Sequence, residues 1–299
     1  MTSTATTRSA SAGILLMLAG LFMFSVNDAL GKWLVATYSV WQLLLIRSAA
    51  ALVVLAPFIW REGTRPFVEA PKPALQIVRI VFSTLEVAGF YWAVTYLSLA
   101  DVMTFYLAAP IYVTAISALF LREQVGWRRW SAVLIGFIGV IIALRPTSAS
   151  WSAPALIALA GSICFSFLLI VTRHLRGTSD TVLVTGQTVA ALILGAALAP
   201  FAWVPPSAAD AALLALLGVV AMIAHVCVNR SLKLAPASVV VPYQYSLIVW
   251  AIVFGFLVFG DVPDFAMLAG AAVIICAGLY IFIREQVRKV KTAPIADLP

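Results

Sequence analysis

The chain has 299 residues, of which 63% are hydrophobic and only 10% charged, and its mean hydropathy is +1.06. This composition excludes a soluble domain with a polar surface and indicates a protein that crosses a membrane several times. The formal net charge of +7 lies mainly in short segments between apolar runs, which is typical of membrane insertion and leaves no basic face for nucleic acid.

Charged or proline-rich points divide the chain into ten apolar stretches, each close to the ~20 residues that a helix needs to cross a bilayer. In chain order, the predicted helices are 13–35, 40–60, 74–97, 101–121, 127–145, 153–175, 181–203, 209–232, 236–259 and 264–284. We therefore expect an all-α membrane protein of ten transmembrane helices, with short tails at residues 1–12 and 286–299.

The basic residues predict the orientation of these helices. The chain has 19 lysines and arginines. With the N-terminus in the cytoplasm, all of them except Lys32, Arg47 and Arg145 lie at cytoplasmic helix ends or in cytoplasmic loops. Positive charge on the cytoplasmic side is the general rule for inserted helices. The sequence thus predicts a multi-pass protein of the bacterial inner membrane with both termini in the cytoplasm.

Short segments of the first half recur in the second half in the same order. LAGLFMFS at residues 18–25 matches LAGSICFS at 159–166, LAPFIW at 55–60 matches LAPFAW at 198–203, and LSLA at 97–100 matches LKLA at 232–235. Each half contains five predicted helices, so the second half enters the membrane in the opposite direction. We expect a first repeat at 13–145 and a second, inverted repeat at 153–285 around a central cavity, as in secondary transporters.

Several longer segments then resemble a known family. They are LIRSAAAL, LSLADVMTFYLAAPIYV, LFLREQVGWRRW and LAPASVVVPYQYSLIVWAIVFGFLVFGDVPD. Together with the ten helices in two halves, they resemble the EamA-type transporters of the drug/metabolite transporter superfamily. The resemblance implies a basket-like helical bundle that moves small metabolites by alternating access. It leaves the substrate open among amino acids, nucleotide sugars, vitamins and S-adenosylmethionine.

The repeat indicates which polar residues the scaffold itself does not require. Asn27 and Asp28 align with leucines of the second half, and Arg47 and Glu86 align with alanines. Lys32, in contrast, aligns with Arg173 and is interpreted as a helix-end residue that reaches the headgroups. An ionised group deep in the membrane is costly, so we expect Asp28, Arg47 and Glu86 to face the interior.

Two interpretations of this charged group remain open. Arg47 could close a buried ion pair with Asp28 or Glu86, or the cluster could form a polar wall that binds the amino and carboxyl groups of a zwitterion. Proton coupling through a carboxylate is a further option.

Aromatic and amide residues complete the predicted cavity. The candidates that line it are Asn27, Asp28, Arg47, Glu86, Tyr106, Gln187, His225, Asn229, Tyr243, Tyr245 and Trp250. Pro110 and Pro242 lie inside predicted helices, where proline removes a hydrogen bond and bends the helix. These bends suit either gating or static packing.

No motif predicts catalysis, a metal site or a cofactor, because two histidines alone make no metal site and no phosphate loop or nucleophile elbow is present. We expect a secondary transporter of small polar or amphipathic metabolites, with export of amino acids as the leading hypothesis. A carrier for a nucleotide-type, vitamin or S-adenosylmethionine-like substrate is the first alternative, and a channel or intramembrane enzyme the second. The expected partners are a small-molecule substrate and the lipid bilayer, without nucleic acid, and a monomer is one option for the assembly.

Overall fold

The computed structural model describes residues 2–97, 99–120, 126–144 and 152–260, and short stretches between 262 and 280. Every regular element in these residues is a helix. The longer helices are α1 (Thr2–Val35), α2 (Val40–Glu62), α4 (Pro73–Tyr96), α7 (Trp127–Leu144), α8 (Ala153–His174), α9 (Asp180–Leu198) and α10 (Ala208–Leu234). The shorter elements are α3 (Arg65–Val68), α5 (Leu99–Tyr106), α6 (Ala109–Phe120), η2 (Ala199–Ala202), α11 (Ala237–Val240), η3 (Val241–Ser246) and α12 (Leu247–Phe259).

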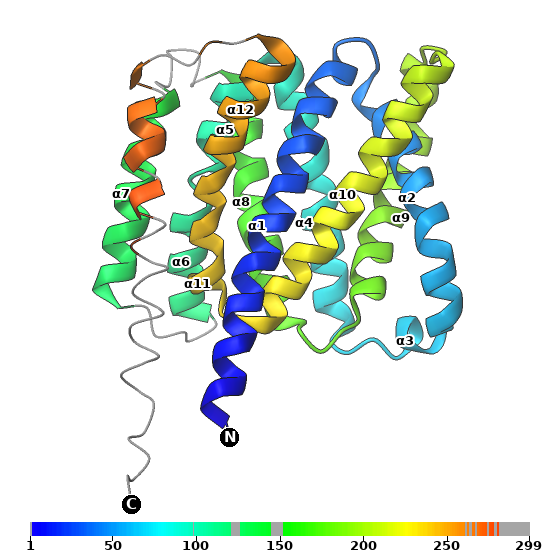
Figure 1. Ribbon diagram of the computed structural model, residues 1–299. Helices are drawn as coiled ribbons and strands as arrows, with labels where there is room; N and C mark the ends of the chain where they lie inside the picture. The colour runs from blue at the N-terminus through cyan, green and yellow to red at the C-terminus, as the bar shows by residue number, and fades with distance from the viewer. Residues whose placement is uncertain are drawn as a thin grey trace, which may run out of the picture.

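The longer helices stand side by side in one bundle (Figure 1). The N-terminus and the short helix α3 lie at the same end of this bundle, because α1 and α2 cross it in opposite directions (Figure 1). We name this the inner end, since its positive charge predicts a cytoplasmic location. The opposite end, with the turn between α1 and α2, is the outer end.

Seven described helical segments are long and apolar enough to cross a bilayer. They are Ser11–Val35, Val40–Glu62, Pro73–Tyr96, Ala153–His174, Asp180–Ala202, Ala208–Leu234 and Val241–Val258. Shorter apolar helices cover Ala109–Ala118, Trp130–Ile142 and Leu268–Ala277. The fold is therefore that of a multi-pass helical membrane protein, and the count of ten crossings stays a prediction.

Two predicted helices are broken where we expected only a bend. In place of the predicted helix 101–121, residues 99–120 form α5 and α6 with a two-residue turn between them, and the stretch 236–259 forms α11, η3 and α12. Pro110 is the second residue of α6, and Pro242 is the second residue of η3. Proline has no N–H and its ring clashes with the preceding turn, so it is favoured in the first turn of a helical segment, as at these two positions.

The packing of the helices repeats with the two halves exchanged. α1 packs along α10, and α8 packs in the same way along α4, so the first long helix of each half lies against the third predicted helix of the other half. The second helices of the two halves, α2 and α9, pack on each other. Ser39 and Ser179 cap these two helices alike, each with a hydroxyl that accepts a hydrogen bond from the amide three residues on. Such an exchange is expected for an inverted repeat.

Two glycines allow helices of opposite halves to cross at backbone contact. A Cβ atom at Gly218 of α10 would overlap the carbonyl oxygen of Arg47 in α2, and a Cβ atom at Gly195 of α9 would lie 2.6 Å from the amide nitrogen of Leu45. Small residues are the usual means of close helix packing in lipid. The contact at Gly218 fixes the backbone position of Arg47.

Candidate functional site

A central cavity lies between the two halves, and its larger lobe has an empty volume of about 610 Å³, including the space at its mouth. We name it the charged lobe. It is lined by Leu21, Phe24, Asn27, Asp28, Arg47, Glu86, Val87, Phe90, Tyr91, Met103, Tyr106, Phe165, His225 and Leu247. Six residues that the sequence predicts for the cavity therefore meet here, from α1, α2, α4, α5 and α10.

The three charged side chains of this lobe do not neutralise one another by contact. Among the described residues, Arg47 forms no ion pair with Asp28 or Glu86, although its side chain is buried with 8% exposed. Its Nη1 atom has no hydrogen-bond partner. The buried ion-pair clamp is therefore not formed in this structure, and the alternative of a polar cavity wall agrees with these positions.

An aromatic ring holds Arg47 instead. The guanidinium carbon lies 5.5 Å from the centre of the Tyr91 ring, within the range of a cation–π contact. The Asn27 Nδ2 atom donates a hydrogen bond of 2.8 Å to the Tyr91 hydroxyl. The same ring packs where Gly31 has no side chain, since a Cβ atom there would collide with it. Tyr91, which the sequence analysis does not assign to the site, thus orients the one arginine that lines the charged lobe.

Aromatic side chains form much of the remaining wall. Phe24 and Phe165 both line the lobe, and they are matching residues of LAGLFMFS and LAGSICFS. Phe24 meets the His225 ring edge-on at 5.0 Å, and Phe90 meets the Tyr106 ring edge-on at 5.2 Å. Neither phenylalanine is among the cavity residues predicted from the sequence, although their identity in the clearest repeat segment is a usable signal.

A second, smaller lobe adjoins the charged lobe and has an empty volume of about 390 Å³, including the open space at its mouth. The two lobes share Arg47, Val87 and His225. The other residues that line the second lobe are Leu44, Ser48, Ala51, Ser83, Gln187, Thr188, Ala191, Gly218, Ala221 and Met222. Among the described residues that line it, only Arg47, which it shares with the charged lobe, and His225 are ionisable, and none is a carboxylate; we name it the neutral lobe. The predicted candidate Gln187 lies here rather than beside Asp28.

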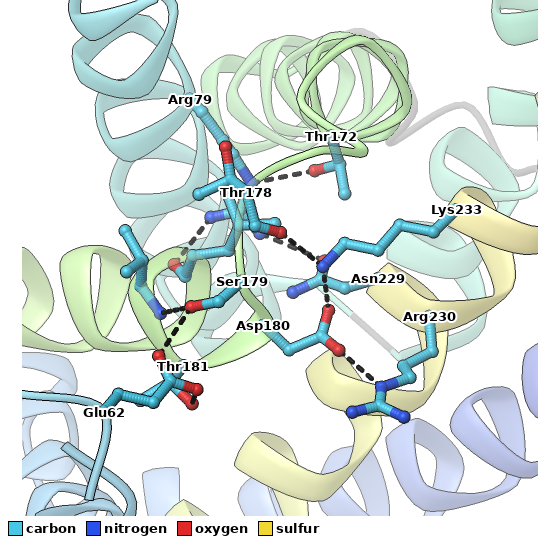
Figure 2. A network of polar contacts seen from close by, with 12 residues as sticks. Glu62, Arg79, Thr172, Thr178, Ser179, Asp180, Thr181, Asn229, Arg230 and Lys233 are labelled. Atoms are coloured by element: carbon cyan, nitrogen blue, oxygen red, sulfur yellow. Dashed lines mark hydrogen bonds and ion pairs between the residues drawn. The ribbon is translucent and has the colours of Figure 1, made fainter. Parts of the chain in front are cut away.

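Toward the inner end, Arg79 links the first half to three helices of the second half (Figure 2). Its side chain is only 1% exposed. It donates hydrogen bonds to Thr172 of α8 (2.8 Å), to the carbonyl oxygen of Leu183 in α9 (2.8 Å) and to Asn229 of α10 (3.1 Å). From the sequence, Arg79 is expected only as one of the basic residues of the cytoplasmic end, and its burial is not predicted.

Other polar contacts join the halves at both ends of the bundle. At the inner end, Glu62 accepts hydrogen bonds from Ser179 and Thr181 (2.8 and 2.7 Å). Figure 2 also shows the ion pairs of Asp180 with Arg230 and Lys233, which join α9 to α10 within the second half.

At the outer end, Tyr38 donates a hydrogen bond of 2.8 Å to Asp210, and this bond raises the pKa of the Tyr38 phenol. Gln42 exchanges two hydrogen bonds with the backbone of Val204. The described halves are therefore in polar contact on both sides of the cavity.

The remaining predicted site residues lie in various surroundings. Asn229 accepts the hydrogen bond from Arg79. Tyr245 donates one to the backbone of Val133, and Trp250 meets Phe22 edge-on at 4.7 Å. Tyr243, Pro110 and Pro242 are buried in the broken helices. A role of these residues in binding or gating stays a prediction.

Comparison with known families supplies the identity. The sequence model of the EamA-like transporter family matches residues 11–145 and matches again at residues 152–284. The chain belongs to the EamA-like transporter family. Two successive matches to one family fit the two-repeat architecture seen in the packing of this EamA-like protein.

Curated relatives of this EamA-like transporter carry different substrate names. The S-adenosylmethionine uptake transporter of Rickettsia felis is 24% identical over 92% of this chain and 93% of its own. The riboflavin transporter of Vibrio cholerae is 27% identical over 79% and 80%, and the pseudopaline exporter of Pseudomonas aeruginosa is 27% identical over 89% and 94%. The prediction of transport rather than catalysis is confirmed.

A solved crystal structure supports the fold of this EamA-like chain. It superposes with a TM-score of 0.79 and covers 93% of this chain and 99% of its own, at 16% sequence identity. Likeness at this identity concerns the fold alone. The chemistry of the EamA-like cavity must therefore be argued from its own residues.

Proposed function

We propose that this EamA-like transporter is a secondary carrier for zwitterions derived from amino acids, working by alternating access of repeats 13–145 and 153–285. The observation that supports it best is Arg47, which lines the charged lobe with an unpartnered Nη1 atom and no ion pair among the described residues. A planar guanidinium matches a carboxylate, since it can donate two parallel hydrogen bonds. A substrate carboxylate would supply the missing acceptor.

The other charges of the lobe suit the opposite end of a zwitterion. Asp28 and Glu86 line the same space as Arg47 and come from α1 and α4. A substrate ammonium group between them would relieve the cost of two carboxylates in a low-dielectric site. The rings of Phe24, Phe90 and Phe165 would then bind an apolar or aromatic side chain.

An S-adenosylmethionine-like substrate is the second candidate. With both carboxylates ionised, Asp28, Glu86 and Arg47 sum to one negative charge. S-adenosylmethionine carries a carboxylate, an ammonium and a sulfonium group, so it brings one net positive charge and an aromatic base. Aromatic faces attract such cations, and relatives named for its uptake span nearly the whole chain.

Broken helices in both halves support the transport cycle. Tyr106 at the end of α5 and Leu247 at the start of α12 line the charged lobe. Discontinuous helices at corresponding positions of two repeats are typical of substrate sites in secondary transporters. Amino-acid export remains the predicted direction, and relatives named for uptake and for export both occur.

Transport by the purified protein in liposomes tests this function. We expect saturable movement of methionine, phenylalanine or S-adenosylmethionine, and none of the matching amines that lack the carboxylate. Arg47→Met should raise the KM about 10- to 100-fold, because a hydrogen bond to a charged group contributes about 1.5–3 kcal/mol. Arg65→Met, at an exposed arginine of α3, is the matched control and should leave the KM unchanged. Ion currents at channel rates, or chemical change of the substrate, would support the channel or enzyme alternatives instead.

A further inference from the structure

The neutral lobe lies where matching residues of the two halves meet. The register that aligns LAPFIW with LAPFAW pairs Leu44 with Gln187 and Ser48 with Ala191. All four of these residues line the neutral lobe. The lobe therefore lies on the axis that relates the two repeats, and this is where secondary transporters bind their substrates.

The register of the third predicted helices gives the same result. It aligns LSLA with LKLA and pairs Ser83 with Gly218 and Val87 with Met222. These residues also line the neutral lobe. In three of these pairs, a polar residue of one half (Gln187, Ser48 or Ser83) matches a small or apolar residue of the other half. The shared scaffold therefore does not require the polar residue.

Two of these polar side chains have hydrogen-bonding capacity to spare. Gln187 is 5% exposed, and its Oε1 atom accepts a long bond of 3.3 Å from Ser83. Among the described residues, its Nε2 atom has no acceptor, and the hydroxyl of Ser48, 4% exposed, has no partner. Buried polar groups in proteins normally have partners. An amide with two unused donors, 95% buried and facing a cavity, points to a ligand that supplies an acceptor.

We infer that the neutral lobe is a second subsite for an uncharged, hydrogen-bonding part of the same substrate, such as a hydroxylated or amide-bearing group. This inference rests on the proposed function, because Arg47 stands between the lobes and would hold the carboxylate of the substrate there. The substrate is then larger than a plain amino acid: its charged and aromatic parts occupy the charged lobe, and its polar extension reaches Gln187.

Gln187→Leu tests the subsite, because it gives both halves a leucine at this position and removes only the amide. The probes are two extended amino acids, S-adenosylmethionine and S-adenosylhomocysteine, and two plain ones, methionine and phenylalanine. We expect the KM of the extended probes to rise about tenfold, as for one lost buried hydrogen bond, while the KM of the plain probes changes less than about twofold. Ser48→Ala should shift the extended probes in the same direction, because Ala191 already fills the matching position.

The outcomes separate this subsite from the proposed function. If wild-type protein transports plain amino acids but no extended probe, or if Gln187→Leu changes both groups equally or not at all, the subsite is overturned and the carrier function stands. If wild-type protein transports no amino-acid zwitterion, both proposals fail. Size-exclusion chromatography shows whether Gln187→Leu fails to fold. In that case Thr188→Val, at the neighbouring position in the same lobe, provides the selectivity measurement. The hydroxyl of Thr188 donates to Val184 but can still accept from a ligand, so this variant must also weaken only the extended probes.

Discussion

Asp28, Arg47 and Glu86 bring charge into the membrane without pairing directly with one another. Insertion scales assign about 2.5–3.5 kcal/mol to a charged residue at the centre of a helix. The Tyr91 ring lies under the guanidinium, and this cation–π contact offsets part of the free energy needed to place Arg47 in the membrane. Charges kept in the membrane at such a cost are typical of substrate or ion pathways.

Removing charge from the lobe is expected to impair transport more than removing it from the helix end. Glu86→Gln and Asp28→Asn should lower kcat/KM about tenfold or more, because each deletes a carboxylate that lines the cavity. Lys32→Gln is the matched control, since Lys32 does not line either described lobe. Initial rates of uptake into liposomes measure the three variants. An equal loss in all three would contradict the ranking.

The helices around the cavity combine broken segments with one rigid junction. α5–α6 and α11–η3–α12 are interrupted at Pro110 and Pro242 and leave backbone groups that the surrounding helices can satisfy. Arg79 of α4, in contrast, ties together α8, α9 and α10 near the inner end. The broken helices suit movement, and the Arg79 contacts hold the two halves together at the inner end in this structure.

Arg79→Met is expected to destabilise the protein. The methionine keeps most of the length but loses three hydrogen bonds, which together contribute about 2 kcal/mol at the average of about 0.6 kcal/mol per bond measured in membranes. The thermal unfolding midpoint in detergent should fall by about 4–8 °C. Arg65→Met serves as control, because the Arg65 side chain is 83% exposed. A midpoint equal to that of the control would show that the Arg79 contacts contribute no stability.

At the scale of the whole molecule, two halves with exchanged packing enclose one cavity. Polar contacts between the halves occur at the inner end, through Glu62 and Arg79, and at the outer end, through Tyr38 and Gln42. Alternating access requires each set to part in turn while the other holds. The difference between the ends is that Arg79 aligns with Leu214 in the second half, so the buried arginine strengthens only the inner closure.

The orientation in the membrane is testable with single cysteines in a variant without the native ones. A cysteine at Arg65 in α3 should be protected from a membrane-impermeant maleimide in intact cells and react after permeabilisation. A cysteine at the exposed Ala208, near the outer end of α10, should react in intact cells, because the positive-inside rule assigns this end to the outside. The reverse pattern would mean that both termini lie outside.

Much of the architecture could be predicted because lipid imposes strict lengths on helices. Apolar stretches of about 20 residues gave the helix order, and the matched segments gave the inverted halves. The same alignment singled out Asp28, Arg47 and Glu86 as residues that only one half requires, and the structure brings them to one lobe. The breaks at Pro110 and Pro242 were expected only as bends, because sequence does not tell whether neighbouring helices satisfy the freed backbone groups.

The sequence by itself therefore determined the class of protein, the repeat and the charged residues of the cavity, since hydropathy and charge act locally along the chain. Only the tertiary structure decided that Arg47 lies on Tyr91 rather than on a carboxylate, that Arg79 is buried, and that Gln187 belongs to a second lobe. These outcomes depend on which face of each helix contacts the helices of the other half. That choice is fixed by close crossings such as the one at Gly218, where residues far apart in sequence meet.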